Sequence, residues 1–115
     1  MKPLIFVADS LLAIREFPKA VKQHLGFALY EAQTGGKHID SKPLKNIGGG
    51  VLEVVSDHRG NTFRTVYTVK LKKAVYVLHA FQKKSKHGIA TPKNVMDLVK
   101  QRLERAIEID RELEN

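Results

Sequence analysis

Positively charged side chains gather near the ends of two expected strands of this chain. Arg64 lies within the segment from Thr62 to Val69, and Lys83 and Lys84 follow the segment from Ala74 to Phe81. If these segments are adjacent strands in hairpin register, the start of the first and the end of the second lie at the same end of a sheet. A planar guanidinium and two ammonium groups held there would bind a phosphate and neutralise charge developing on it.

Such a group of cations suits the cleavage of RNA. An RNA strand breaks when its 2′-hydroxyl attacks the adjacent phosphodiester, and a catalyst must align that attack, neutralise the phosphorane-like transition state and transfer protons. Cations can supply the alignment and the neutralisation without a metal ion. Beyond this centre, Arg59, Lys86 and Lys93 are expected to hold the RNA backbone. Phe81 could stack on a base or belong to the core.

Each of these residues also has a purely structural interpretation. Arg64 could form an ion pair with Glu53 on the neighbouring strand. Lys83 and Lys84 could be solvated loop residues. His79 alternates within an apolar strand, a position more typical of a hydrogen-bonded core histidine than of a catalytic one.

Other kinds of site lack their sequence signatures. Gly48-Gly49-Gly50 is not followed by the Lys-Ser/Thr of a phosphate-binding loop. The chain has no cysteine, and its histidines, at positions 24, 38, 58, 79 and 87, show no metal-ligand spacing. The sequence therefore predicts neither a metal site nor a cofactor.

The net charge of +8 is concentrated in one part of the sequence. Residues 58–102 carry eleven Lys or Arg against the single acid Asp97, a balance of +10. Residues 1–57 balance to +1, and residues 103–115 to −3. Scattered solubilising charge would not leave 45 residues with one acid, so this segment indicates a surface for a polyanion.

The elements that must position these residues follow from apolar periodicity and turn signals. Residues 4–8 predict a buried strand, and Asp9 or Ser10 could cap a short helix over 11–16. A second helix begins near Pro18 and ends at Gly35-Gly36. Its predicted apolar face comprises Val21, Leu25, Ala28, Leu29 and Ala32. Residues 37–50 are expected to form a loop.

Three strands and a helix are expected in the second half. The strands cover residues 51–56, 62–69 and 74–81, with a polar turn over 57–61. The third is apolar on both faces apart from His79, so it should lie inside the sheet. Thr91-Pro92 predicts the start of the last helix, with an apolar stripe of Val95, Val99, Leu103 and Ala106.

Together these elements predict one α+β domain over residues 1–115, with an N-terminal strand and helical hairpin, an antiparallel three-strand meander and a C-terminal helix. A chain of 115 residues suits a single core. The N-terminal apolar run is too short for a signal or a spanning helix, which needs about 20 apolar residues. The absence of cysteine fits a reducing compartment, and a cytoplasmic location is expected.

Two stretches resemble a known family of toxins. Thr62-Phe63-Arg64-Thr65-Val66-Tyr67 resembles the aromatic-Arg-x-x-Tyr strand of the RelE/ParE superfamily, and the stretch from Tyr76 to Lys93 resembles its phage-related HigB-like branch. The resemblance implies a RelE-like fold and the toxin of a type II toxin–antitoxin system. Such toxins are endoribonucleases that cleave mRNA in the ribosomal A site, and a HigA-like helix-turn-helix antitoxin silences them.

The resemblance also implies roles for single residues. Arg64 matches the family arginine at the scissile phosphate, and Lys83-Lys84 match the basic pair that carries a transition-state cation. The chain departs from the RelE pattern because residues 51–56 contain no lysine and residues 85–95 contain no tyrosine. Proton transfer would then fall to His87, His58 or Glu53. The alternatives are a ParE-like, non-catalytic inhibitor of DNA gyrase and an inactive antitoxin-binding module.

Overall fold

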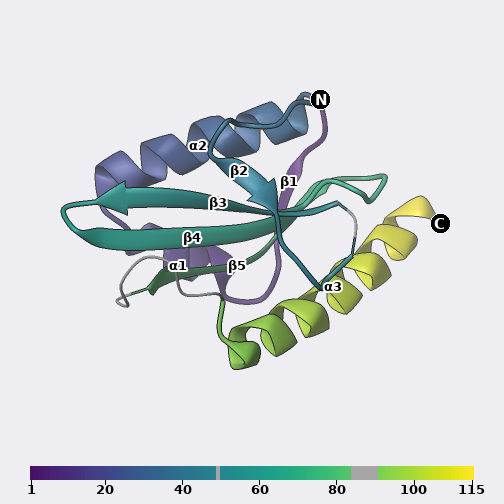
Figure 1. Ribbon diagram of the computed structural model, residues 1–115. Coiled ribbons are helices and arrows are strands. Elements are labelled where there is room, and N and C mark those ends of the chain that lie inside the picture. Colours follow the sequence, from purple (N-terminus) through teal and green to yellow (C-terminus); the bar gives the residue numbers. More distant parts are fainter. Residues whose placement is uncertain (49, 84–90) are drawn as a thin grey trace.

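A five-stranded sheet runs through the molecule in the order β1-β5-β4-β3-β2 (Figure 1). The computed structural model describes residues 1–48, 50–83 and 91–115. Along the chain the elements are β1 (Leu4–Phe6), α1 (Ser10–Arg15), α2 (Lys19–Gln33), β2 (Ser41–Pro43), β3 (Val51–His58), β4 (Asn61–Thr68), β5 (Val75–Lys83) and α3 (Lys93–Glu114). The predicted α+β class is confirmed. β1 runs parallel to β5, and the other neighbouring strands are antiparallel.

Helices cover both faces of this sheet (Figure 1). On one face α1 and α2 pack on strand residues that include Val54, Phe63 and Val77. The five residues predicted for the apolar face of α2 are all buried. On the other face α3 packs through Val99 and Ala106, with Val95 and Leu103 partly buried beside them. No helix in the described residues is both long and apolar enough to cross a membrane.

β2 lies where the sequence predicted only a loop. Its three residues carry no alternating pattern, so periodicity could not reveal it. Pairing holds it in place, with Ser41 opposite Val54 and Pro43 opposite Leu52. The buried Tyr67 hydroxyl also donates to Ser41 Oγ at 2.7 Å. Tertiary contacts therefore hold β2 in the sheet, although its own sequence carries no strand pattern.

The turn between β3 and β4 is tighter than the predicted five-residue turn. His58 pairs with Asn61, which leaves only Arg59 and Gly60 in the connection. Both have positive φ, 49° and 81°, as the favoured two-residue hairpin turn requires. Asn61 and His58 therefore belong to strands, and Arg59 lies at the tip of the hairpin.

β5 contains an irregularity that changes which side chains share a face. Val66 of β4 pairs with His79, but the next residue, Tyr67, pairs with Val77, so Leu78 has no partner in β4. One extra residue in a strand is a β-bulge, and it reverses the alternation of side chains beyond it. His79, Phe81 and Lys83 consequently lie on the α3 side of the sheet.

The starts of two helices differ from the predicted capping. Asp9 occupies the N-cap of α1 without a side-chain capping bond, and Ser10 donates its hydroxyl to the carbonyl of Val77 at 3.2 Å. α3 begins at Lys93 with Pro92 at the N-cap. Thr91 is therefore not its cap, and its hydroxyl contacts a different group, described below.

Candidate active site

The pairing of β4 with β5 brings predicted site residues together at one end of the sheet. Arg64 lies opposite Phe81, and Thr62 lies opposite Lys83. Arg64 also pairs with Val55 of β3, which places Glu53 diagonally across from it on the same face. The predicted proximity of Arg64 and Lys83 is thus present, and the sheet adds a carboxylate to them.

Arg64 and Glu53 form a buried ion pair. Arg64 Nη1 donates to Glu53 Oε1 at 2.7 Å, and the two side chains are 13% and 2% exposed. The ion-pair interpretation of Arg64 is therefore correct as a description of its contact. Arg64 Nε is buried without a hydrogen-bond partner among the described residues. A buried unsatisfied donor costs about 1–3 kcal/mol, so an acceptor that binds Nε would recover this free energy.

Lys83 lies at the end of β5 and is 8% exposed. Burial lowers the pKa of its ammonium, the neighbouring positive charge of Arg64 lowers it further, and Glu53 opposes both effects. The interpretation of Lys83 as a solvated loop residue is wrong, because Lys83 is a buried strand residue. Arg64, Lys83 and the Glu53 carboxylate therefore share this end of the sheet, and the exposed Asp57, opposite Thr62, lies on the same face.

Thr91 connects the start of α3 to this group. Its hydroxyl lies 3.4 Å from Glu53 Oε2, while Oε1 accepts from Arg64. Glu53 thus has both carboxylate oxygens directed to partners. Held in this way, it fixes the guanidinium of Arg64 rather than acting as a freely accessible base.

His79 belongs to a hydrogen-bonded network beside the cations. Arg102 of α3 donates from Nη1 to His79 Nδ1 and to the carbonyl of Leu78, both at 3.0 Å, and pairs through Nη2 with Asp9 at 2.6 Å. Because a guanidinium can only donate, His79 Nδ1 carries no proton. Burial lowers the pKa of His79 and Arg102 lowers it further, against a smaller opposite effect of Asp9. His79 is therefore the predicted hydrogen-bonded histidine, neutral at pH 7.

Phe81 lies between this network and the cations. Its ring stacks on His79 with centroids 5.2 Å apart and 20° between the planes. Phe81 is half-buried, unlike the fully buried apolar residues further along β5. It is neither wholly core nor wholly surface, so part of its ring is accessible beside Arg64.

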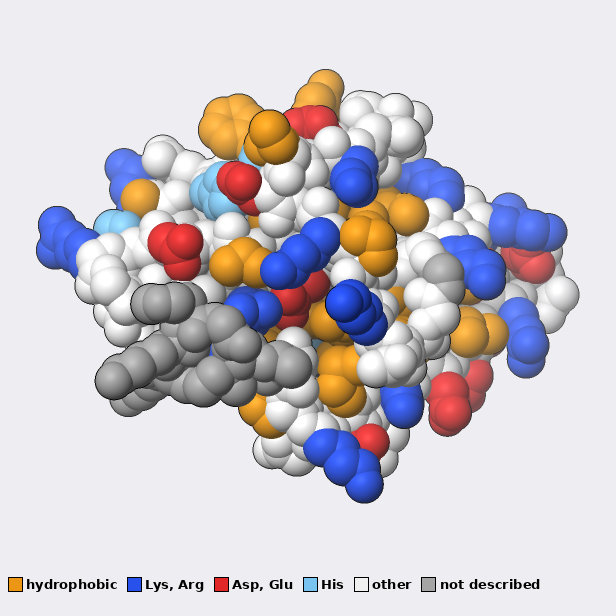
Figure 2. Space-filling view, in the orientation of Figure 1, with side chains coloured by type: hydrophobic (Ala, Val, Ile, Leu, Met, Phe, Trp, Pro, Cys, Tyr) orange, Lys and Arg blue, Asp and Glu red, His pale blue; other side chains and the backbone are white. Residues whose placement is uncertain are grey.

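Two of the basic residues predicted to hold RNA are exposed at the ends of elements. Arg59, at the tip of the β3–β4 hairpin, and Lys93, the first residue of α3, are both exposed. Figure 2 shows Lys and Arg side chains gathered in the middle of the view around a small acidic patch. Lys84, Lys86 and His87 lie outside the described residues.

Not every residue considered for proton transfer is near Arg64. His58 lines a hollow together with His24 and Ser56, on the α2 side of the sheet. Arg64, two residues from Val66 along β4, faces α3 instead. Among the described residues considered for this role, only Glu53 contacts Arg64.

Two groups of side chains were not foreseen. The Arg102–His79–Asp9 network joins three distant segments and depends on the bulge in β5, for which the sequence has no clear signal. His24, His38 and Asp40 also lie together, on the opposite side of the sheet from Arg64. Their spacing of fourteen and two residues matches no common ligand motif, so only the fold reveals them.

The arrangement at the end of the sheet can bind and polarise a phosphate group. A guanidinium whose buried Nε has no acceptor among the described residues, together with a partly desolvated ammonium, would offer two charges to the same anion.

Comparison with known proteins gives one match. A family model described as phage-derived protein Gp49-like (DUF891) matches residues 13–104, which span all the described site residues except Asp9. No curated protein and no solved structure matches the chain.

Proposed function

We propose that this chain, which belongs to the family of phage-derived Gp49-like proteins, is a ribosome-dependent endoribonuclease that cleaves mRNA. The family is one of RelE/ParE-like toxins and is associated with toxin–antitoxin systems. The stretch from Tyr76 to Lys93 supports placement in the HigB-like branch. The single observation that carries the proposal is the pair of Arg64 and Lys83, which are neighbouring, largely buried cations at one end of the sheet.

The reaction is a transesterification within the RNA strand. The 2′-hydroxyl attacks phosphorus and loses its proton, and the 5′-oxygen of the next nucleotide leaves and gains one. The products are a 2′,3′-cyclic phosphate and a 5′-hydroxyl end. Negative charge grows on the phosphoryl oxygens during the attack, and cations fixed in advance lower that barrier.

Each residue has a part in this scheme. Arg64 donates to the phosphoryl oxygens and Lys83 adds a second charge, while Glu53 is a positioning residue for Arg64. Lys84 and His87 keep the roles that their sequence positions suggest, Lys84 as a further cation and His87 as the group that transfers a proton. Because cations supply the neutralisation, we expect cleavage without added divalent metal.

Substrate binding would use the surroundings of this centre. Arg59 and Lys93 contact the RNA backbone, together with Lys86, and Phe81 offers part of its ring to a base. Since the substrate is mRNA in the ribosomal A site, the protein would act in the cytoplasm.

The proposed partner that silences the toxin is a small HigA-like helix-turn-helix antitoxin. Phe27 and Tyr30 lie three residues apart on α2 and are 68% and 56% exposed. Large aromatic side chains exposed on one helix are typical of interaction surfaces. They lie on the helix that covers the face opposite Arg64.

The decisive experiment is to express the chain briefly and map new RNA ends. We expect breaks within translated frames that carry 5′-hydroxyl groups, and none when translation is blocked before the ribosome engages mRNA. An Arg64→Lys/Lys83→Gln variant is the inactive control. Intact mRNA with inhibited DNA supercoiling would instead support the gyrase inhibitor. Intact mRNA with normal supercoiling and retained antitoxin binding would support the inactive module.

A further inference from the structure

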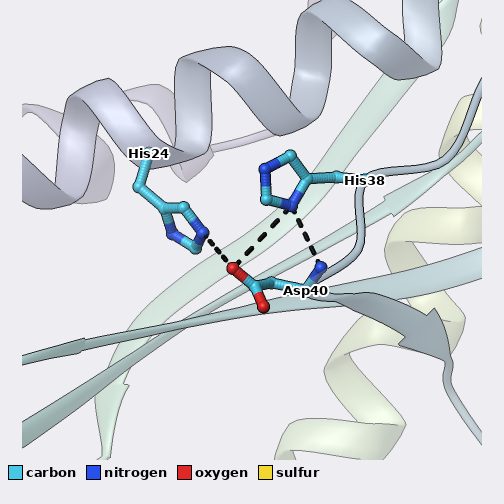
Figure 3. Close-up of side chains that lie close together, drawn as sticks. All are labelled: His24, His38 and Asp40. Atoms are coloured by element: carbon cyan, nitrogen blue, oxygen red, sulfur yellow. Dashed lines mark hydrogen bonds and ion pairs between the residues drawn. The ribbon is translucent and has the colours of Figure 1, made fainter.

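Three ligand-type side chains converge on the side of the sheet away from Arg64. His24 comes from α2, and His38 and Asp40 come from the segment that leads into β2. One ligand atom from each lies within 4.8 Å of the others. Figure 3 shows both imidazole rings beside the Asp40 carboxylate.

The distances fit a small tetrahedral metal ion. His24 Nε2 lies 2.7 Å from Asp40 Oδ2, and His38 Nδ1 lies 3.9 Å from the same oxygen. Nitrogen and oxygen ligands at zinc-bond lengths are about 3.4 Å apart in a tetrahedron. The two separations lie on either side of that value, so small side-chain movements would complete the geometry.

Each histidine is already oriented by a second hydrogen bond. His24 Nδ1 lies 2.5 Å from Ser56 Oγ on β3. Because a carboxylate oxygen accepts, Nε2 donates its proton to Asp40 in this structure; when the proton is carried by Nδ1 instead and donated to Ser56 Oγ, the lone pair of Nε2 can bind a metal, as in most histidine ligands. His38 Nδ1 accepts the backbone N–H of Asp40 at 3.0 Å, so it carries no proton, and this hydrogen bond must open for the same lone pair to bind the metal.

The surroundings leave room for a fourth ligand. His24 and Asp40 border a hollow of about 250 Å³ that also includes Ser56 and His58. Two imidazoles and one carboxylate with an open position form a donor set typical of Zn²⁺.

We propose that His24, His38 and Asp40 bind one Zn²⁺ ion, with water as the fourth ligand, and that the ion fastens the segment before β2 to α2. His24 is 27% and His38 13% exposed, so the ion would be partly shielded, while Asp40 at 51% provides the entry side. The site is separate from the cations of β4 and β5 and does not depend on the proposed nuclease activity.

The test uses the full, untagged chain after dialysis against a chelator. Calorimetric titration with Zn²⁺ should show one ion per chain, and Co²⁺ should give the visible absorption of a tetrahedral site. Bound Zn²⁺ should raise the Tm, because a ligand that binds only the folded state stabilises it.

Variants separate this site from incidental binding. His24→Ala, His38→Ala and Asp40→Asn should each lower Zn²⁺ affinity by at least about tenfold, the smallest loss usual even for partners of metal ligands. His58→Ala is the matched control, a histidine of the same hollow that is not a proposed ligand, and should bind Zn²⁺ as the wild type does. Asp40→Asn guards against misfolding, because its side chain is half exposed and nearly unchanged in shape.

Two results would overturn the proposal. The first is the absence of one-to-one binding at micromolar Zn²⁺, which would make the group an ordinary Asp–His ion pair. The second is equal binding by the wild type and the three ligand variants, which would place the ion elsewhere.

Discussion

Because Arg64 and Glu53 form a buried ion pair, a substitution of either residue changes the stability of the protein as well as its activity. Glu53 is 2% exposed, so its charge is balanced almost wholly by neighbouring groups. Removing one member of a buried pair leaves an uncompensated charge and costs about 3–5 kcal/mol. A loss of toxicity in Arg64→Ala would therefore mix catalysis with folding.

A paired replacement separates the two effects. We expect Arg64→Ala to lower the free energy of unfolding by about 3–5 kcal/mol, whereas Arg64→Met with Glu53→Leu should recover most of it, because apolar residues of similar size replace both charges. Both proteins should lose cleavage by about 10²–10³-fold, the usual cost of one stabilising donor. Urea unfolding and single-turnover cleavage measure the two quantities. A stable, fully active double variant would exclude Arg64 from the reaction.

The lowered pKa of Lys83 gives a second prediction at this scale. Its folded pKa lies below the ordinary 10.5, so the folded state disfavours the charged ammonium. Stability should therefore rise as pH increases from the lowered value towards 10.5, since the cost of the buried charge disappears. NMR titration of lysine side chains should show one group titrating below the rest, and Lys83→Arg should remove that signal. If no lysine titrates below the others, the ammonium of Lys83 is not desolvated.

At the scale of elements, periodicity predicted much of the fold. The apolar face of α2 and the stripe of α3 follow directly from 3.6-residue spacing, because burial against a sheet selects one side of a helix. β2 was missed because an edge strand of three residues carries no pattern. The face on which Lys83 lies could not be predicted from the sequence either, because it depends on one residue of β5 that has no partner in β4.

Asp110 shows how a single side chain joins two elements. Its carboxylate accepts from the backbone N–H groups of Lys72 and Lys73, at 3.1 and 2.8 Å, and from the Tyr76 hydroxyl at 2.8 Å. α3 is thereby bonded to the connection between β4 and β5. This buried acid had no predicted role, because helix periodicity alone would place it as an interruption of the apolar stripe.

We expect Asp110→Ala to destabilise the protein by about 3 kcal/mol or more, because three donors lose a charged acceptor. Burial alone would raise the pKa of Asp110, but the hydrogen bonds from Lys73, Lys72 and Tyr76 lower it overall. The stabilisation is therefore present above the ordinary value of 3.8 and is lost as pH falls through the lower folded value.

Thermal unfolding against pH measures this effect. Asp97→Asn is the matched control, an exposed acid on the same helix, and should change stability little. A wild-type protein that loses no more stability than Asp110→Asn on acidification would contradict the assignment.

At the scale of the whole molecule, the basic segment does not form one surface. Lys70, Lys72 and Lys73 lie at the β4–β5 connection, whereas Lys83 lies at the other end of β5. The nine residues of β5 separate these ends by about 26 Å. Arg102 is held by Asp9 and His79. The charge available around Arg64 is therefore smaller than the sequence balance of residues 58–102 suggests.

The salt dependence of binding can distinguish specific contacts to the RNA backbone from attraction by the total charge. Arg59→Ala with Lys93→Ala should flatten the log–log dependence of ribosome binding on salt by about 1.4, or 0.7 for each lost contact to a single strand. The cleavage rate at saturation should stay close to that of the wild type. Lys19→Ala with Lys22→Ala removes the same charge from α2, on the opposite face, and should leave the slope unchanged. Equal slopes for both pairs would mean that only bulk charge attracts the RNA.

The unpaired Leu78 decides whether the odd-numbered or the even-numbered side chains at the end of β5 face α3. Before it, the even-numbered Tyr76 faces α3, and beyond it the odd-numbered His79, Phe81 and Lys83 do. If Leu78 were instead paired like its neighbours, regular alternation would exchange the two sets, turning Lys83 towards the α2 core and Gln82 towards the side of Arg64. The bulge at Leu78 therefore brings Lys83 to the same face as Arg64, and the pair of cations depends on it as much as on the two residue types. A substitution beyond Leu78 changes one side chain, whereas the loss of a residue between Leu78 and Lys83, with the bulge retained, would move every later side chain of β5 to the opposite face.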